Sequence, residues 1–135
     1  MKTFSTLTLA IALLCAGSAL AAGAKKAPPD VQSAFEAFIA KFRAALAHND
    51  AAAVAGMAQL PFQGDPAVAT AAQFQAKIYK ANFTAKNRAC LQNAAPAYDR
   101  DPDNNDSFFF TCGDASFVFT KTAAGFLLAD IGAND

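Results

Sequence analysis

Cys90 and Cys112 are the residues of this chain that could most readily form a covalent link. A zinc site or a cysteine nucleophile needs histidine partners, and the chain has a single histidine, His48. The third cysteine, Cys15, lies in the predicted signal peptide described below, so two remain after cleavage. Two cysteines in an exported protein predict a disulfide. In a chain-entropy view, closing a loop of about 22 residues would stabilise the fold by about 3 kcal/mol.

Asp130 is the acid with the most unusual surroundings in the sequence. It interrupts the apolar stretch "FLLADIG", where a charge is uncommon. If its side chain faced a cavity, it could act as a general base. The favoured alternative is that Asp130 alternates outward to solvent or marks the end of a strand, since a single unusual acid is weak evidence of a site.

A second group of acids lies in "DRDPDNND", residues 99–106. Asp99, Asp101 and Asp103 have the one-in-two spacing of a calcium loop. The sixth position is Asn104 rather than glycine, and the twelfth is Phe110 rather than glutamate. The stretch therefore favours a solvated acidic turn over a metal site.

The N-terminus has the pattern of a signal peptide. Lys2 precedes an apolar run from Leu7 to Cys15, and Ala19-Leu20-Ala21 supplies small residues for cleavage after Ala21. The run is too short to span a membrane, and no later stretch qualifies as a span either. Lipidation of Cys15 is disfavoured because Leu14 precedes it. The sequence predicts export to the bacterial periplasm or secretion.

The rest of the chain predicts one small domain, residues 30–135, after a linker at 22–29. The whole sequence has 11 basic and 11 acidic residues and no basic stripe, which argues against nucleic acid as a partner. It has no phosphate-binding glycine loop and no metal-spaced His/Cys cluster, so we expect no cofactor.

Helical periodicity dominates the first half of the domain. A strong amphipathic helix is predicted over Val31–Ala47 with Asp30 as its N-cap, and Asn49 can take the left-handed position at its end. A second helix, 51–60, should bury Val54, Met57 and Leu60 and end at Pro61. A third helix should bury Phe74, Ile78 and Ala81. A fourth helix, 85–94, should carry Cys90. The expected caps of these three helices are Asp50, Thr70 in a capping box with Gln73, and Thr84.

After Pro96 the pattern changes to strands. "AYDR", "SFFFTC", "ASFVFTK" and "GFLLADI" are separated by turn signals, which predicts an antiparallel meander. A two-residue turn at Gly113-Asp114 would pair Phe110 with Phe117, Phe108 with Phe119, and Cys112 with Ala115. A three-residue turn would break this grouping. Helices followed by a meander indicate an α+β domain with helices on one side of the sheet. The phenylalanines expected in the core or lining a cavity are Phe35, Phe38, Phe42, Phe74, Phe108, Phe110, Phe117 and Phe119.

In their order along the chain, "FEAFIAKFRAALAHNDAAAVAGMAQLPF", "FQAKIYKANFTAKNRACLQNA", "FFFTCG" and "GFLLADI" resemble small exported proteins of the nuclear-transport-factor-2-like superfamily. The resemblance implies a curved sheet wrapped around the first helix, leaving a conical, cystatin-like cavity. Some proteins of this kind are isomerases or dehydratases that use a tyrosine and acids in an apolar cavity. In this chain the residues available for those roles are Tyr79, Tyr98, Asp114 and Asp130, of which Asp130 is the more interesting acid.

Phe109 and Val118 would face away from the helices, where an apolar patch on a small domain needs a cover. We expect a homodimer through this face, as is common in the resembled fold. Three functions stay open. They are a non-catalytic protein that binds an apolar small molecule or a protein partner, an isomerase- or dehydratase-type enzyme using Asp130 and a tyrosine, and a periplasmic inhibitor or immunity-type protein.

Overall fold

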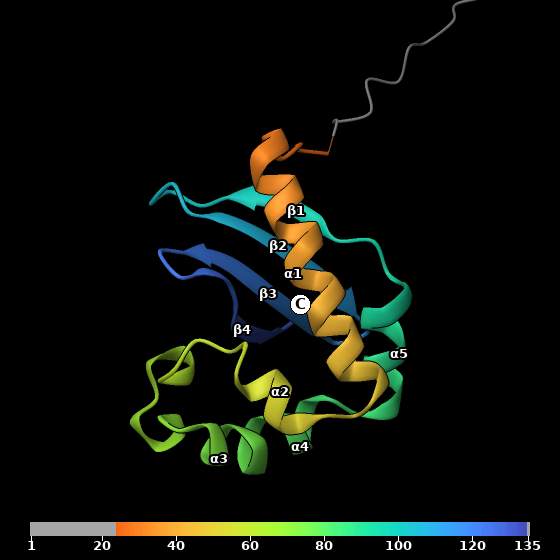
Figure 1. Ribbon diagram of the computed structural model, residues 1–135, viewed down its shortest axis with the longest axis vertical. Coiled ribbons are helices and arrows are strands. Elements are labelled where there is room, and N and C mark those ends of the chain that lie inside the picture. Colours follow the sequence, from red (N-terminus) through yellow and green to blue (C-terminus); the bar gives the residue numbers. More distant parts are fainter. Residues whose placement is uncertain (1–23, 135) are drawn as a thin grey trace, which may run out of the picture.

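The computed structural model describes residues 24–134, and the predicted signal-peptide residues lie outside this range. One long helix, α1, crosses one face of a four-stranded sheet, and shorter helices gather at one end of that face (Figure 1). The fold is therefore α+β with helices packed on an antiparallel sheet, as predicted. The elements are α1 (Pro29–Ala47), α2 (Ala51–Ala55), η1 (Phe62–Gly64), η2 (Pro66–Val68), α3 (Ala71–Gln73), η3 (Phe74–Tyr79), α4 (Lys80–Asn82), α5 (Ala85–Asn93), β1 (Ala97–Arg100), β2 (Asp106–Cys112), β3 (Ala115–Thr122) and β4 (Gly125–Ala133).

Helix α1 begins one residue before the predicted cap. Pro28 is the N-cap and Asp30 lies in the first helical turn, so the prediction of Asp30 as cap is wrong. The first helical residue is Pro29, and proline suits that position because the first helical N–H has no partner within the helix. The residues of α1 that are buried are Val31, Phe35, Ile39, Phe42, Ala45 and Leu46. Phe38 lies at the flank of this stripe and is only half-buried, although the sequence placed it in the core.

Helix α2 is shorter than predicted. Asp50 caps it as expected, since its side chain accepts a hydrogen bond from the backbone N–H of Ala53. The helix ends at Ala55, and the following residues leave it to pair with the edge of the sheet. Gln59 N donates to Leu128 O, and Leu128 N donates to Met57 O, each at 2.9 Å. Pairing with β4 thus replaces the last turns that helical periodicity predicted.

The third helical segment runs from Ala71 to Asn82 and is π-helical in its middle, η3. It starts with the predicted capping box of Thr70 and Gln73. A π-turn has more residues than an α-turn, so side chains five apart share a face. Phe74 and Tyr79 are the buried pair, whereas Ile78 is half-buried and Ala81 is exposed. The prediction that Ile78 and Ala81 face inward is corrected in this way.

Helix α5 is joined to the sheet by a disulfide. Thr84 caps the helix, as predicted, by accepting a hydrogen bond from the N–H of Asn87. Cys90 on α5 is bonded to Cys112 at the end of β2, with their Cα atoms 5.8 Å apart. This link confirms the disulfide predicted from two cysteines in an exported chain.

The sheet is a meander in the order β1-β2-β3-β4. The predicted hairpin register is confirmed, with Phe110 opposite Phe117, Phe108 opposite Phe119 and Cys112 opposite Ala115. Gly113 has φ +62°, the left-handed conformation that a two-residue turn with glycine first requires. Between β3 and β4 the pairing shifts, so that Val118 faces Asp130 while Phe119 faces Leu128. Ala129 is therefore an extra residue, a β-bulge.

The core lies between α1 and the inner face of the sheet. Of the eight phenylalanines predicted there, seven are buried: Phe35, Phe42, Phe74, Phe108, Phe110, Phe117 and Phe119. The sequence did not single out Phe62, Val68 and Phe83, which are also buried. Within residues 24–134, no helix is both long and apolar enough to cross a membrane.

Candidate functional site

The space between α1 and the sheet is occupied by aromatic rings. Phe35 stacks on Phe108 with ring centroids 3.9 Å apart, and Phe42 meets Phe119 edge-on at 4.9 Å. Phe110, Phe117 and Phe119 are fully buried. Rings at these separations are in direct contact. Where the resemblance implies a conical cavity, this chain has a packed aromatic interior.

Asp130 does not face that interior. It lies on β4 opposite Val118, which places it on the outer face of the sheet. Its carboxylate accepts a hydrogen bond from the side-chain amide of Gln63, which also donates to the carbonyl of Ile131 at 3.1 Å. The contact is exposed, and Asp130 joins the loop at Gln63 to the edge of the sheet.

Tyr79 lies in η3 on the helical side of the molecule, whereas Asp114 lies in the turn between β2 and β3, and Asp130 lies on β4. Its hydroxyl donates to Oδ1 of Asn49 at 2.7 Å, and its ring stacks on Phe83 at 4.8 Å. Burial raises the pKa of Tyr79; Arg88 partly offsets this and Asp50 adds to it. Tyr79 closes the loop after α1 and has no acid as its hydrogen-bond partner.

Tyr98 has a carboxylate partner that sequence reasoning missed. Its hydroxyl donates to Oδ1 of Asp106 at 2.7 Å, and Arg100 Nε lies 3.5 Å from the same oxygen. Asp106 is buried on the inner face, next but one to Phe108. The hydrogen bond to Asp106, followed by burial, raises the pKa of Tyr98. The signal for this pair was the register of the β1–β2 hairpin, which places Arg100 opposite Asp106.

The residues suggested for general acid–base chemistry are therefore kept apart. Tyr98 is on β1 and Asp130 on β4, the two opposite edges of the sheet, while Tyr79 is on a helix. General acid–base catalysis requires groups within hydrogen-bond reach of one substrate. The structure does not bring these three together.

Asp99, Asp101 and Asp103 are not gathered around a common point either. Asp99 pairs with Lys25, and Asp101 accepts hydrogen bonds from the backbone and side chain of Asn105. The hydrogen bond from Lys25 lowers the pKa of Asp99, and those from Asn105 lower the pKa of Asp101. No three His, Cys, Asp or Glu side chains within residues 24–134 are placed to share a metal ion.

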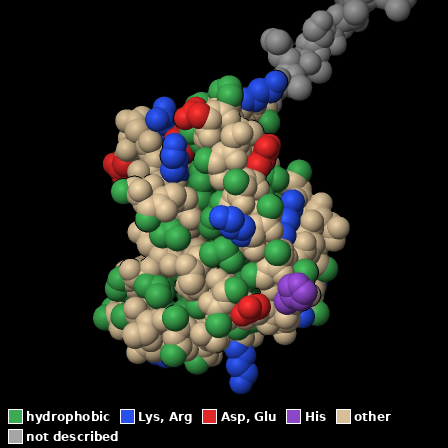
Figure 2. Space-filling view, viewed as in Figure 1, with side chains coloured by type: hydrophobic (Ala, Val, Ile, Leu, Met, Phe, Trp, Pro, Cys, Tyr) green, Lys and Arg blue, Asp and Glu red, His purple; other side chains and the backbone are tan. Residues whose placement is uncertain are grey.

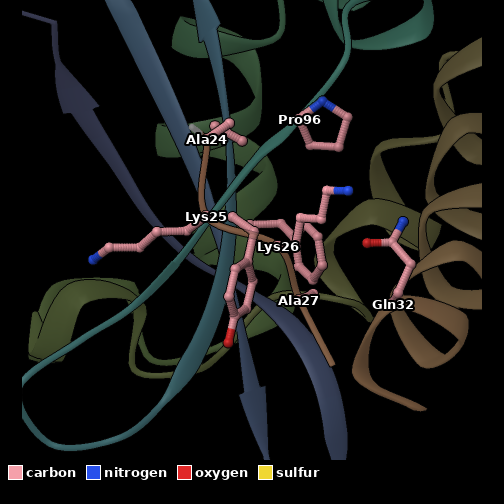
Figure 3. A pocket seen from close by; sticks show the side chains of 9 residues that line it. Ala24, Lys25, Lys26, Ala27, Gln32 and Pro96 are labelled. Atoms are coloured by element: carbon pink, nitrogen blue, oxygen red, sulfur yellow. The ribbon is translucent and has the colours of Figure 1, made fainter. Parts of the chain in front are cut away.

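A hollow of about 400 Å³ lies where the N-terminal segment, residues 24–27, crosses β1 near the start of α1 (Figure 3). Its apolar surface includes the rings of Tyr98 and Phe108, whose centroids are 5.2 Å apart. Gln32 of α1 and Pro96 stand at its sides. We call this the β1 hollow; its lining is Ala24, Lys25, Lys26, Ala27, Gln32, Pro96, Ala97, Tyr98 and Phe108.

The two lysines at the hollow have different surroundings. Lys25 reaches Asp99, whereas Lys26 extends the opposite way from the backbone, on the side of Pro96 and Gln32 (Figure 3). The two ion pairs found in residues 24–134 involve Lys25 and Arg100, so Lys26 has no carboxylate partner in that range. Elsewhere on the face that carries α1, charges are scattered rather than gathered in a stripe (Figure 2).

The outer face of the sheet is mostly uncharged. One row of paired residues crosses all four strands: Ala97, Phe109, Val118 and Asp130. Phe109 and Val118 are half-buried at its centre, and no helix in the described part of the chain, residues 24–134, covers them. Beside the row, the hydroxyls of Ser107 and Thr120 are bonded to each other at 2.9 Å. The face thus offers a small apolar centre with little exposed charge.

No family model matches this chain, and no curated protein or solved structure shows significant similarity to it.

Proposed function

We propose that this chain is an exported, non-catalytic binding protein that acts through its surface and not through an internal cavity. The observation that carries the proposal is the aromatic interior. Phe35, Phe108 and their neighbours occupy the space in which the resembled fold would hold a substrate. The acid and tyrosines suggested for catalysis lie on separate elements, which weighs against the isomerase or dehydratase alternative.

Export is supported by two independent features. One is the N-terminal pattern of Lys2, the apolar run and Ala19-Leu20-Ala21. The other is the disulfide between Cys90 and Cys112, because structural disulfides persist mainly outside the reducing cytoplasm. The nuclear-transport-factor-2-like resemblance is part of the same proposal and agrees with the helix-on-sheet architecture.

The proposal includes a homodimer through the outer face of the sheet. A twofold axis parallel to the strands would lay the central row onto itself in reverse. Phe109 would then meet Val118 of the second copy, and Asp130 on β4 would approach the β1 edge, where Lys25 lies. Apolar residues would meet at the centre and opposite charges at the rim, the usual anatomy of an interface.

The face is small for a stable dimer. Four strands about 4.8 Å apart and about seven residues long cover roughly 450 Å² in projection. Typical specific interfaces bury about 800 Å² per partner. We therefore expect a weak dimer, with a Kd on the order of micromolar.

Sedimentation velocity over a wide concentration range tests the dimer. We expect Phe109→Asp to abolish the association, because it places a charge at the apolar centre. Ser33→Asp is the matched control, because Ser33 is exposed on α1 on the other side of the sheet, and it should dimerise as the wild type does. A wild-type monomer at every concentration, or an unchanged Phe109→Asp dimer, would contradict this part of the proposal.

Native mass spectrometry of the mature protein purified from its own source tests the binding role. A retained small molecule or a stoichiometric protein partner is the expected result. A protein partner whose activity is blocked would favour the inhibitor or immunity-type alternative. A bare mass, together with no partner retained by the immobilised protein, would argue against a binding role.

A further inference from the structure

We propose that the β1 hollow binds a flat apolar group that carries a carboxylate. This inference rests on the proposed binding function and names the ligand chemistry of one site. The hollow combines an aromatic floor with a lysine that has no acidic partner in the described part of the chain. Binding sites of this type pair a mostly apolar lining with a few polar groups that fix orientation.

The floor of the hollow is held in place from below. Phe108 is 2% exposed and stacks on Phe35 with the ring planes 6° apart. Tyr98 beside it is tied by its hydroxyl to Asp106. Phe108 thus supports the half-buried ring of Tyr98, which forms the aromatic surface accessible from the hollow, and aromatic ligands gain most from surfaces that need no rearrangement.

In the described residues, the charged group of the lining that has no ion-pair partner is the ammonium of Lys26. Lys25 is occupied by Asp99, and this contact helps to hold segment 24–27 against β1. Lys26 extends from the same segment toward Pro96 and Gln32 (Figure 3). The acids that contact lining residues are already bonded: Asp99 to Lys25, Asp106 to Tyr98 and Arg100, and Glu36 to the side-chain amide of Gln32. An anionic group is therefore the complementary partner.

The volume limits the size of the ligand. About 400 Å³ lies at the lower end of small-molecule sites. This suits a ring system of roughly 10 to 15 non-hydrogen atoms. The same chemistry occurs in free aromatic acids and in a peptide that ends in an aromatic residue, and the experiment separates these two sources.

The test is an NMR titration of the ¹⁵N-labelled mature chain with 1-naphthoate. We expect a Kd on the order of 1 mM or tighter, and amide shifts confined to residues 24–32 and 97–98. The uncharged isostere 1-naphthamide should bind at least about threefold more weakly, since it lacks the charge. N-acetylphenylalanine represents a peptide C-terminus. If N-acetylphenylalanine binds more tightly than 1-naphthoate, the ligand group comes from a peptide C-terminus. If 1-naphthoate binds more tightly, the ligand is a free aromatic acid.

Lys26→Glu provides the decisive variant. It should weaken naphthoate binding about fivefold or more, because an attraction becomes a repulsion. Lys41→Glu makes the same change at an exposed position of α1 outside the lining and should change binding by less than about twofold. Shifts spread over the whole protein, or equal effects of the two variants, would overturn the proposal. A ligand of different chemistry found by native mass spectrometry would then leave the binding function standing without this site.

Discussion

Three consecutive phenylalanines in β2 have different environments on the two faces of one sheet. Phe108 and Phe110 point to the inner face and are buried under α1, whereas Phe109 between them points to the outer face and is half-buried. Strand geometry accounts for the direction of each ring, because successive side chains point to opposite faces, but it does not make one face more buried than the other. What differs is the cover. Within residues 24–134, helices cover the inner face and none covers the outer face.

This difference separates what stabilises the molecule from what is left for recognition. The inner face is a continuous cluster of rings with the disulfide at one end, at Cys112. The outer face has a small apolar centre, paired hydroxyls and acids at its edges. Core residues report on folding, while an uncovered apolar centre is the feature that a partner can use. The predictions below test that division.

The largest effect should come from removing an inner ring. Phe119→Ala should lower the free energy of unfolding by about 3–5 kcal/mol, because Phe119 is fully buried against Phe42 and Phe110. Phe109→Ala is the matched outer-face change and should cost the monomer about 1 kcal/mol or less. Urea unfolding at low protein concentration measures both. Equal losses would show that the two faces are equally packed.

Removing the disulfide should have the next largest effect. Replacing Cys90 and Cys112 together by alanine should lower the free energy of unfolding by about 3 kcal/mol, because the unfolded chain regains the entropy of an open loop. Urea unfolding with and without a reductant measures this. The reductant should destabilise the wild type and leave the variant unchanged; a wild type indifferent to reduction would contradict the prediction.

The stability of the protein should depend on the hydrogen bond that Tyr98 donates to Asp106 on the inner face of the sheet. Tyr98→Phe leaves the buried Asp106 without its 2.7 Å donor and should cost about 1–3 kcal/mol of stability. Tyr79→Phe is the control: its partner Asn49 is exposed and can bond to water instead, so the loss should be smaller. Thermal unfolding compares the two.

A titration of Tyr98 gives the same interaction a second readout. The carboxylate of Asp106 raises the pKa of Tyr98, so Asp106→Asn should bring it back toward the ordinary value. Because the folded-state pKa is raised, this contribution to stability is present below about pH 10 and is lost as the pH rises through the folded-state pKa. An unchanged ultraviolet titration in Asp106→Asn would contradict this account.

The smallest effect on stability should come from Asp99, the acid on β1 that pairs with Lys25. The hydrogen bond from Lys25 lowers the pKa of Asp99, so Lys25→Met should return it toward its usual range. Since the folded-state pKa is lowered, the contribution to stability is present above about pH 4 and is lost as the pH falls through the folded-state pKa. Carboxyl NMR titration checks this, with Asp101 as an internal control because Asn105 holds it. A shift of Asp101 as large as that of Asp99 would contradict the assignment.

Where the sequence pattern was local, it predicted the structure closely. Caps at Asp50, Thr70 and Thr84 and the turn at Gly113-Asp114 were confirmed, whereas the cap of α1 is Pro28 and not Asp30. Each depends on a side chain or a φ angle within a few residues, so short-range chemistry decides it. The hairpin register followed from the turn, and with it the face that carries Cys112.

Where helical periodicity failed, the backbone had departed from the regular α-helical period. A π-turn moved burial from Ile78 to Tyr79. Pairing with Leu128 ended α2 before Met57. Asp130 faces outward, as the favoured interpretation of the sequence expected, but for a different reason: strict alternation from Leu128 would have placed it inside, and the extra residue at Ala129 reverses the face. A one-residue change of period is enough to move every later side chain to the other face.

The β1 hollow could not be read from the sequence at all. Its lining comes from an N-terminal segment, the first turns of α1, and β1 with β2, which meet only in the folded chain. The sequence by itself determined the helix-then-meander order, the disulfide and the apolar residues, because these depend on residue type and local spacing, and export stays a prediction from the N-terminal pattern. Tertiary structure alone decided that rings fill the interior, that Asp106 and not Asp130 accompanies a tyrosine, and which face stays uncovered. These outcomes depend on which distant segments share space, and no local period contains that information.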